Sequence, residues 1–119
     1  MTNFEERERA FEAVFAQDQE MRFRAEARCA KLLATWACEH MGLSGREADH
    51  YVQSFMTRMV EGNGIDRLIE KMREDFEAVG ATSDVAEIEL TLTRLTARAA
   101  AEVRRERLTG GERPKDPEK

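Results

Sequence analysis

The chain has 119 residues and a net charge of −5, which leaves room for one domain and argues against a nucleic-acid partner. Charged residues make up 36% of the chain. This exceeds the roughly 25% of an average globular domain and suits slender helices better than a thick α/β core. No apolar run approaches the ~18 residues of a membrane span, and no signal-peptide pattern follows Met1. We therefore expect a cytoplasmic protein that does not insert into a membrane.

The first 20 residues form an acidic segment that carries large aromatic side chains. Phe4, Phe11 and Phe15 recur at i, i+7 and i+11, so a helix would place them on one narrow side. A few apolar anchors on a charged helix are typical of a segment that binds a groove in a partner protein. The alternative is that these side chains pack on the protein's own core. Because the segment is highly charged, we expect it to be disordered alone and to become helical on a partner.

Four apolar stripes with helical spacing follow the N-terminal segment. They run from Ala25 to Ala37, from Ala48 to Met59, from Ile65 to Val79 and from Ile88 to Val103. The connections between them are short, and no long stretch alternates with a period of two. The sequence thus predicts an all-α four-helix bundle, with the single tryptophan, Trp36, at the centre of the core.

The ends of these helices also have recognisable signals. Ser44 and Glu47 fit a capping box, which predicts a helix start. Gly80 fits the position after a helix end, and either Ser83 or Asp84 is suited to cap the last helix.

The domain organisation follows from these boundaries. Residues 1–20 are expected to be a mobile arm and residues 21–107 the bundle. Residues 108–119 are rich in Gly, Pro and charge, which predicts a disordered tail.

Residue types that commonly carry chemistry are few. Cys29 and Cys38 lie nine positions apart on one predicted helix, about 13 Å, which is too far for a disulfide, so we expect two buried, reduced thiols. His40 and His50 are expected on helix surfaces, without a nucleophile or an oxyanion motif beside them. We predict no catalytic residue, no metal site and no cofactor, and we do not expect an enzyme.

A basic stretch after residue 20 offers a second kind of site. It consists of Arg22, Arg24, Arg28 and Lys31. These residues could bind a nucleotide or another anion, which would make the protein a helical nucleotide sensor. We favour the alternative that they form an ordinary solvated helix face. An adaptor or a homodimer, built on an aromatic and methionine face, is a further alternative, although we expect a monomer when the protein is free.

Three stretches carry a resemblance to a known family: Arg7–Glu20, Ala27–Gly45 and Lys71–Gly80. They resemble the zeta subunit, the ATPase inhibitor subunit of the alphaproteobacterial F-type ATP synthase. The resemblance implies a four-helix bundle whose N-terminal arm inserts into a catalytic α/β interface of the rotary head and blocks ATP hydrolysis. The implied partners are the α and β subunits, with γ as a further candidate. The protein would then be peripheral to the inner membrane while it is bound to the enzyme.

The resemblance also assigns residues to the inhibitory arm, from Phe4 to about Gln19. The residues expected to bind the partner are Phe4, Arg7, Glu8, Arg9, Phe11, Glu12, Val14, Phe15, Asp18 and Gln19.

Overall fold

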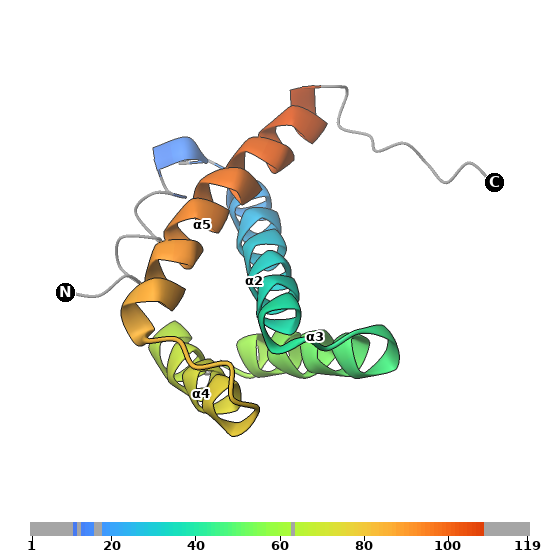
Figure 1. Cartoon of the computed structure of the whole chain (residues 1–119). Coiled ribbons are helices and arrows are strands. Elements are labelled where there is room, and N and C mark those ends of the chain that lie inside the picture. Colours follow the sequence, from blue (N-terminus) through green and yellow to red (C-terminus); the bar gives the residue numbers. More distant parts are fainter. Residues whose placement is uncertain (1–10, 12, 16–17, 63, 109–119) are drawn as a thin grey trace.

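The computed structural model describes residues 11, 13–15, 18–62 and 64–108 (Figure 1). With the labels of Figure 1, the four helices are α2 (Gln19–Met41), α3 (Gly45–Val60), α4 (Ile65–Ala78) and α5 (Val85–Leu108). Every regular element in this described part is helical, so the predicted all-α four-helix bundle is confirmed. The predicted tail lies outside the described residues except for Leu108, the last residue of α5.

Two long helices form the frame of the bundle. Helices α2 and α5 pack on each other and cross, while α3 and α4 are shorter and lie together at one end of that pair (Figure 1). Helix α2 contacts α3, α4 and α5. The frame therefore brings the N-terminal end of α2 and the C-terminal half of α5 into one region.

Glycine ends two helices as the sequence predicts. Gly42 and Gly80 have φ angles of +77° and +76°, which a residue without Cβ adopts at no steric cost. After each glycine the next amide turns back onto the helix. Leu43 N donates to the Cys38 carbonyl oxygen and Ala81 N to that of Phe76, both at 2.8 Å.

Of the helix N-terminal caps predicted from the sequence, the one on α5 is present and the one on α3 is not. Asp84 Oδ1 accepts a hydrogen bond from Glu87 N at 2.9 Å, so Asp84 caps α5. Ser44 occupies the N-cap position of α3 but its side chain makes no capping hydrogen bond, so the predicted capping box is wrong. Gly45, the next residue, has a φ of +60°. The chain therefore enters α3 through a backbone angle outside the helical range.

The centre of the core differs from the prediction. Trp36 is only half-buried, and its ring stacks on His40 with a centroid distance of 5.3 Å and meets Phe76 edge-on at 5.7 Å. His40 is also half-buried, not on the surface, and its Nε2 donates to the Ala81 carbonyl oxygen at 3.0 Å. His50 is exposed, as predicted. The indole and imidazole thus lie at the edge of the core, whose interior holds fully buried side chains such as Phe76, Leu33 and Met72.

Both cysteines are buried free thiols, as predicted. Cys29 Sγ lies 3.6 Å from Thr96 Oγ1, and Cys38 Sγ donates to the Ala48 carbonyl oxygen at 3.6 Å. Burial raises the pKa of the Cys38 thiol, so this sulfur remains protonated at neutral pH.

None of the described helices combines the length and the apolar composition that crossing a membrane requires.

Candidate partner-binding site

The N-terminal aromatic residues form a single helical turn that precedes α2. Phe15 N donates to the Phe11 carbonyl oxygen at 2.8 Å, and Asp18 N donates to the Phe15 carbonyl oxygen at 3.0 Å. The side chains of Phe11 and Phe15 are 0% and 6% exposed, whereas Val14 between them is 42% exposed. The turn therefore directs its two aromatic rings inward and a small apolar side chain outward.

Both phenylalanines belong to the main hydrophobic cluster of the protein. That cluster also contains Met21 and Ala25 at the start of α2 and Val103 near the end of α5. For these two arm residues the structure supports the alternative of packing on the protein's own core. Because the two rings share one cluster with residues of the bundle, their burial removes apolar surface from water.

Asp18 links this turn to the bundle through both of its carboxylate oxygens. Oδ1 accepts from Met21 N at 3.1 Å and so caps α2, while Oδ2 accepts from Arg107 Nη1 at 2.6 Å. The hydrogen bond from the Met21 amide, followed by that from Arg107, lowers the pKa of Asp18. The carboxylate is thus ionised at neutral pH and holds the start of α2 next to the last turn of α5.

The remaining predicted arm residues are distributed differently. Gln19 is exposed and is the first residue of α2. The others lie outside the described residues: Phe4, Arg7, Glu8, Arg9 and Glu12.

Two of the four basic residues predicted to bind an anion face carboxylates of α5. Arg28 donates from Nη1 to Glu102 and from Nη2 to Glu106, both at 2.7 Å. Arg24 shares one of these carboxylates, with its Nη2 at 3.7 Å from Glu106 Oε1. The charge of Arg28 is therefore already matched within the bundle. Of the other two, Arg22 is half-buried and Lys31 is exposed.

These ion pairs also change the pKa values of the groups involved. Burial of the guanidinium by itself lowers the pKa of Arg28, but the hydrogen bonds to Glu106 and Glu102 outweigh this effect and raise the pKa. Hydrogen bonds from Arg98 and Arg28 in turn lower the pKa of Glu102. Arg24 and Arg28 therefore stabilise the α2–α5 contact, because α5 supplies carboxylates directly opposite them.

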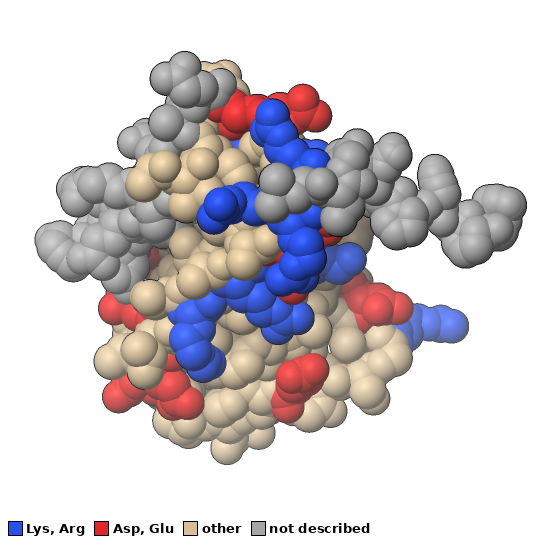
Figure 2. Space-filling model, turned by 90° about the horizontal axis from the view of Figure 1, so that it is seen from above, with Lys and Arg blue, Asp and Glu red and all other residues tan. Residues whose placement is uncertain are grey.

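A larger basic surface lies on α5, and the sequence reasoning missed it. Figure 2 shows Lys and Arg side chains gathered in a band across the face of the molecule seen from above. The exposed arginines of α5 are Arg94, Arg98, Arg104, Arg105 and Arg107. Their number in one helix is the signal by which the sequence could have revealed this surface. Such a band attracts an acidic protein surface even though the whole chain is acidic.

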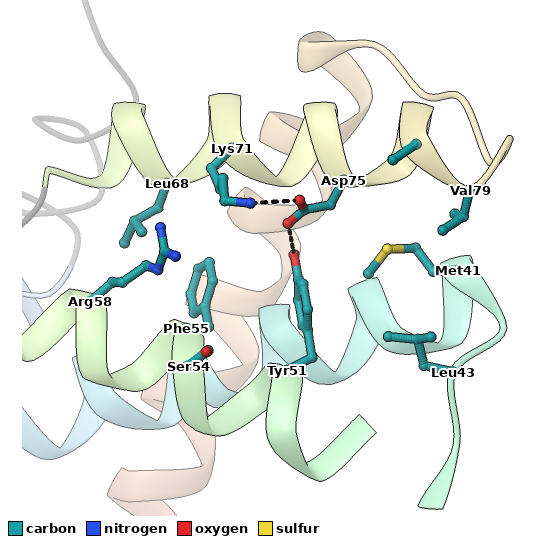
Figure 3. A pocket seen from close by; sticks show the side chains of 11 residues that line it. Met41, Leu43, Tyr51, Ser54, Phe55, Arg58, Leu68, Lys71, Asp75 and Val79 are labelled. Atoms are coloured by element: carbon teal, nitrogen blue, oxygen red, sulfur yellow. Dashed lines mark hydrogen bonds and ion pairs between the residues drawn. The ribbon is translucent and has the colours of Figure 1, made fainter. Parts of the chain in front are cut away.

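A pocket of about 300 Å³ lies between α3 and α4, beside the end of α2 (Figure 3). In its wall, Asp75 accepts hydrogen bonds from Tyr51 Oη at 3.0 Å and from Lys71 Nζ at 2.8 Å. Burial, followed by the adjacent Asp75 carboxylate, raises the pKa of the Tyr51 phenol. Both carboxylate oxygens are engaged: the hydrogen bond from Tyr51 links α3 to α4, whereas the contact with Lys71 lies within α4.

The described residues contain no group of three His, Cys, Asp or Glu side chains that could hold a metal ion. What they do contain is a helical bundle, an aromatic N-terminal turn and a basic band. These features define a small all-helical protein with a highly charged surface.

A family model described as ATPase inhibitor subunit zeta matches residues 1–102, and the chain therefore belongs to this family. The resemblance found in the sequence is confirmed, and the family is one of inhibitor subunits that act on an ATPase. No curated protein and no solved structure matches the chain significantly.

Proposed function

We propose that the protein inhibits ATP hydrolysis by the F-type ATP synthase by inserting its N-terminal arm into a catalytic α/β interface of the rotary head. The observation that carries this proposal is the family match, which spans the arm and most of the bundle. The arm has the chemistry of a wedge: apolar anchors alternate with carboxylates and arginines that can pair with charged residues lining a cleft between subunits.

The mechanism needs no chemistry from the inhibitor itself. A catalytic interface that must open and close during rotation is blocked when a helix occupies it. The bundle consists of four packed helices. It stays outside the catalytic interface and holds the base of the inserted arm. Bound in this way, the protein is peripheral to the inner membrane.

The packing of the arm determines which residues can be deleted to test its role without damaging the bundle. Asp18 caps α2, and Phe11 and Phe15 fill the core, so removing residues 1–19 would damage the bundle as well as the arm. Removing residues 1–10 leaves every described contact in place and still deletes Phe4, Arg7, Glu8 and Arg9. A deletion of residues 109–119 is the control at the other end of the chain.

The test is ATP hydrolysis by the purified rotary head, titrated with each form of the protein. The full chain and the form without residues 109–119 should inhibit equally, and the form without residues 1–10 should lose at least about tenfold in potency, since ~1.4 kcal/mol of lost contact gives that factor. Circular dichroism should show the same helical bundle in all three forms. Equal inhibition by the form without residues 1–10 would show that Phe4, Arg7, Glu8 and Arg9 are not part of the inhibitory contact.

A further inference from the structure

The two phenylalanines that the proposed function assigns to the enzyme are already occupied in the free protein. Phe11 is 0% exposed and Phe15 is 6% exposed, and both lie in the hydrophobic cluster to which all four helices contribute. A side chain buried in the bundle cannot at the same time fill a pocket between two subunits of the enzyme. The arm must therefore leave the bundle before these rings can contact the rotary head.

We propose that the bundle is a binding site for its own arm, and that this parked arm competes with the rotary head for the same two phenylalanine rings. This inference rests on the proposed function and adds a regulatory step to it. The seat for the rings is the hydrophobic cluster of the bundle, which includes Met21 at the start of α2 and Val103 near the end of α5. The free protein is then held in an inactive state that the enzyme must open.

Asp18 is positioned to serve as the fixed point of this movement. Its Oδ1 contact with Met21 N lies within the first turn of α2, so α2 keeps its cap when the aromatic turn leaves. Its Oδ2 contact with Arg107 ties the base of the arm to α5. Loss of that ion pair frees the base of the arm from α5 while α2 remains intact.

The energetic consequence can be stated as a change in potency. The apparent affinity for the head equals the intrinsic affinity multiplied by the fraction of molecules whose arm is free. A change that weakens the seat without altering the arm raises that fraction, and it should therefore make the protein a stronger inhibitor. A change confined to the surface of the bundle should have no such effect.

Two variants test the seat, each with a matched control. Arg107→Gln removes the ion pair to Asp18, and its control is Arg105→Gln, an exposed neighbour with no ion pair to any described residue. Val103→Ala removes apolar contact from the cluster, and its control is Val60→Ala, at a side chain that is 82% exposed. None of these four positions belongs to the arm.

The first measurement uses the free protein with fluorine-labelled phenylalanine and a soluble paramagnetic agent in an NMR experiment. Phe76, at 0% exposure, and Phe23, at 67%, supply the buried and exposed reference signals within the same chain. In the wild-type protein Phe11 and Phe15 should be protected like Phe76. In Arg107→Gln and Val103→Ala their broadening by the agent should move toward that of Phe23, while both controls match the wild type.

The second measurement is the concentration that halves ATP hydrolysis by the purified rotary head. Arg107→Gln should inhibit at a concentration about two- to fivefold lower than the wild type, the range expected for an exposed ion pair. Val103→Ala should also inhibit at a lower concentration, and circular dichroism should show that it retains the bundle.

The outcomes separate the parked arm from the proposed function. If the wild-type protein inhibits but neither seat variant gains potency, the parked arm is rejected and the proposed function stands. Rings as exposed as Phe23 in the wild type would also reject it. A wild-type protein that does not inhibit would reject the proposed function and the parked arm together, even if the NMR experiment shows both rings protected.

Discussion

Arg107 Nη1 lies 2.6 Å from Asp18 Oδ2, and this contact joins residues that are 89 positions apart in the sequence. It connects the start of α2 to the last turn of α5, next to the Arg28 interactions with Glu102 and Glu106. The two ends of the helical frame are thus held together by charge, directly beside the apolar cluster that contains Phe11. The stability of the bundle and the position of the arm should therefore depend on the same region.

The burial of Phe11 predicts a large difference between two substitutions of the same kind. Phe11→Ala should lower the free energy of unfolding by about 3–5 kcal/mol, because it removes a fully buried ring. Phe23→Ala should change it by less than about 0.5 kcal/mol, because that ring is 67% exposed. Urea unfolding followed by circular dichroism measures both values. Equal, small effects would mean that Phe11 is not part of the core in solution.

The ion pairs of Arg28 should make a measurable contribution to stability. Arg28→Ala should lower the free energy of unfolding by about 1–2 kcal/mol, since it removes two charge-assisted hydrogen bonds that solvent screens only in part. Arg28→Lys should recover only a fraction of this loss, because an ammonium group does not span two carboxylates as a guanidinium does. Lys31→Ala, at an exposed position on the same helix, is the control. Unfolding curves that coincide for Arg28→Ala and Lys31→Ala would contradict the assignment.

The depressed pKa of Glu102 predicts a loss of stability in acid. The ordinary pKa of this carboxyl is 4.5, and hydrogen bonds from Arg98 and Arg28 lower it in the folded protein. Below the ordinary value the unfolded chain binds the proton more readily than the folded one, so the stabilisation is present above about pH 4.5 and is lost as the pH falls through the folded pKa. Urea unfolding between about pH 7 and pH 3 should show this fall, and Glu102→Gln should make it shallower. An unchanged acid profile in Glu102→Gln would mean that other carboxylates carry the effect.

The sequence predicted the helices well because their signals are local. The stripe of Ile88, Leu92 and Val103 and the position of Gly80 depend only on spacing and backbone angle within one helix. The location of the arm depends on long-range packing, which helical periodicity does not encode. The spacing of Phe11 and Phe15 shows that they share a face but not what that face meets.

The same limit applies to the charges and the tryptophan. The basic run of α2 resembled an open patch until α5 brought Glu102 and Glu106 opposite Arg28. Trp36 was expected at the centre of the core, but it is half-buried, and the fully buried rings of the core are those of Phe11 and Phe76. The helical spacing of α2 does not show which of its apolar side chains the other helices cover completely.

The single tyrosine allows a direct test of the α3–α4 contact. Burial and the adjacent Asp75 raise the pKa of Tyr51 above its ordinary value of 10.0. Absorbance of the phenolate at alkaline pH should therefore appear later in the folded protein than in urea, and Asp75→Asn should shift it back toward the ordinary value. Because the unfolded chain loses this proton first, stability should fall as the pH rises above 10.0. Titration curves that coincide in the presence and absence of urea would exclude the Tyr51–Asp75 contact.

The most direct test of the proposed inhibition is to locate the arm on the enzyme during ATP hydrolysis. Val14 is the exposed side chain of the aromatic turn, and a photo-crosslinking phenylalanine analogue at this position reports what the arm touches. The same analogue at Val60, which is 82% exposed on the bundle, is the control. We predict that the probe at position 14 crosslinks to the α or β subunit at a catalytic interface, and that the probe at position 60 does not reach that interface. Crosslinks to a catalytic interface from position 60 but not from position 14 would contradict the account, because the bundle and not the arm would then occupy the site.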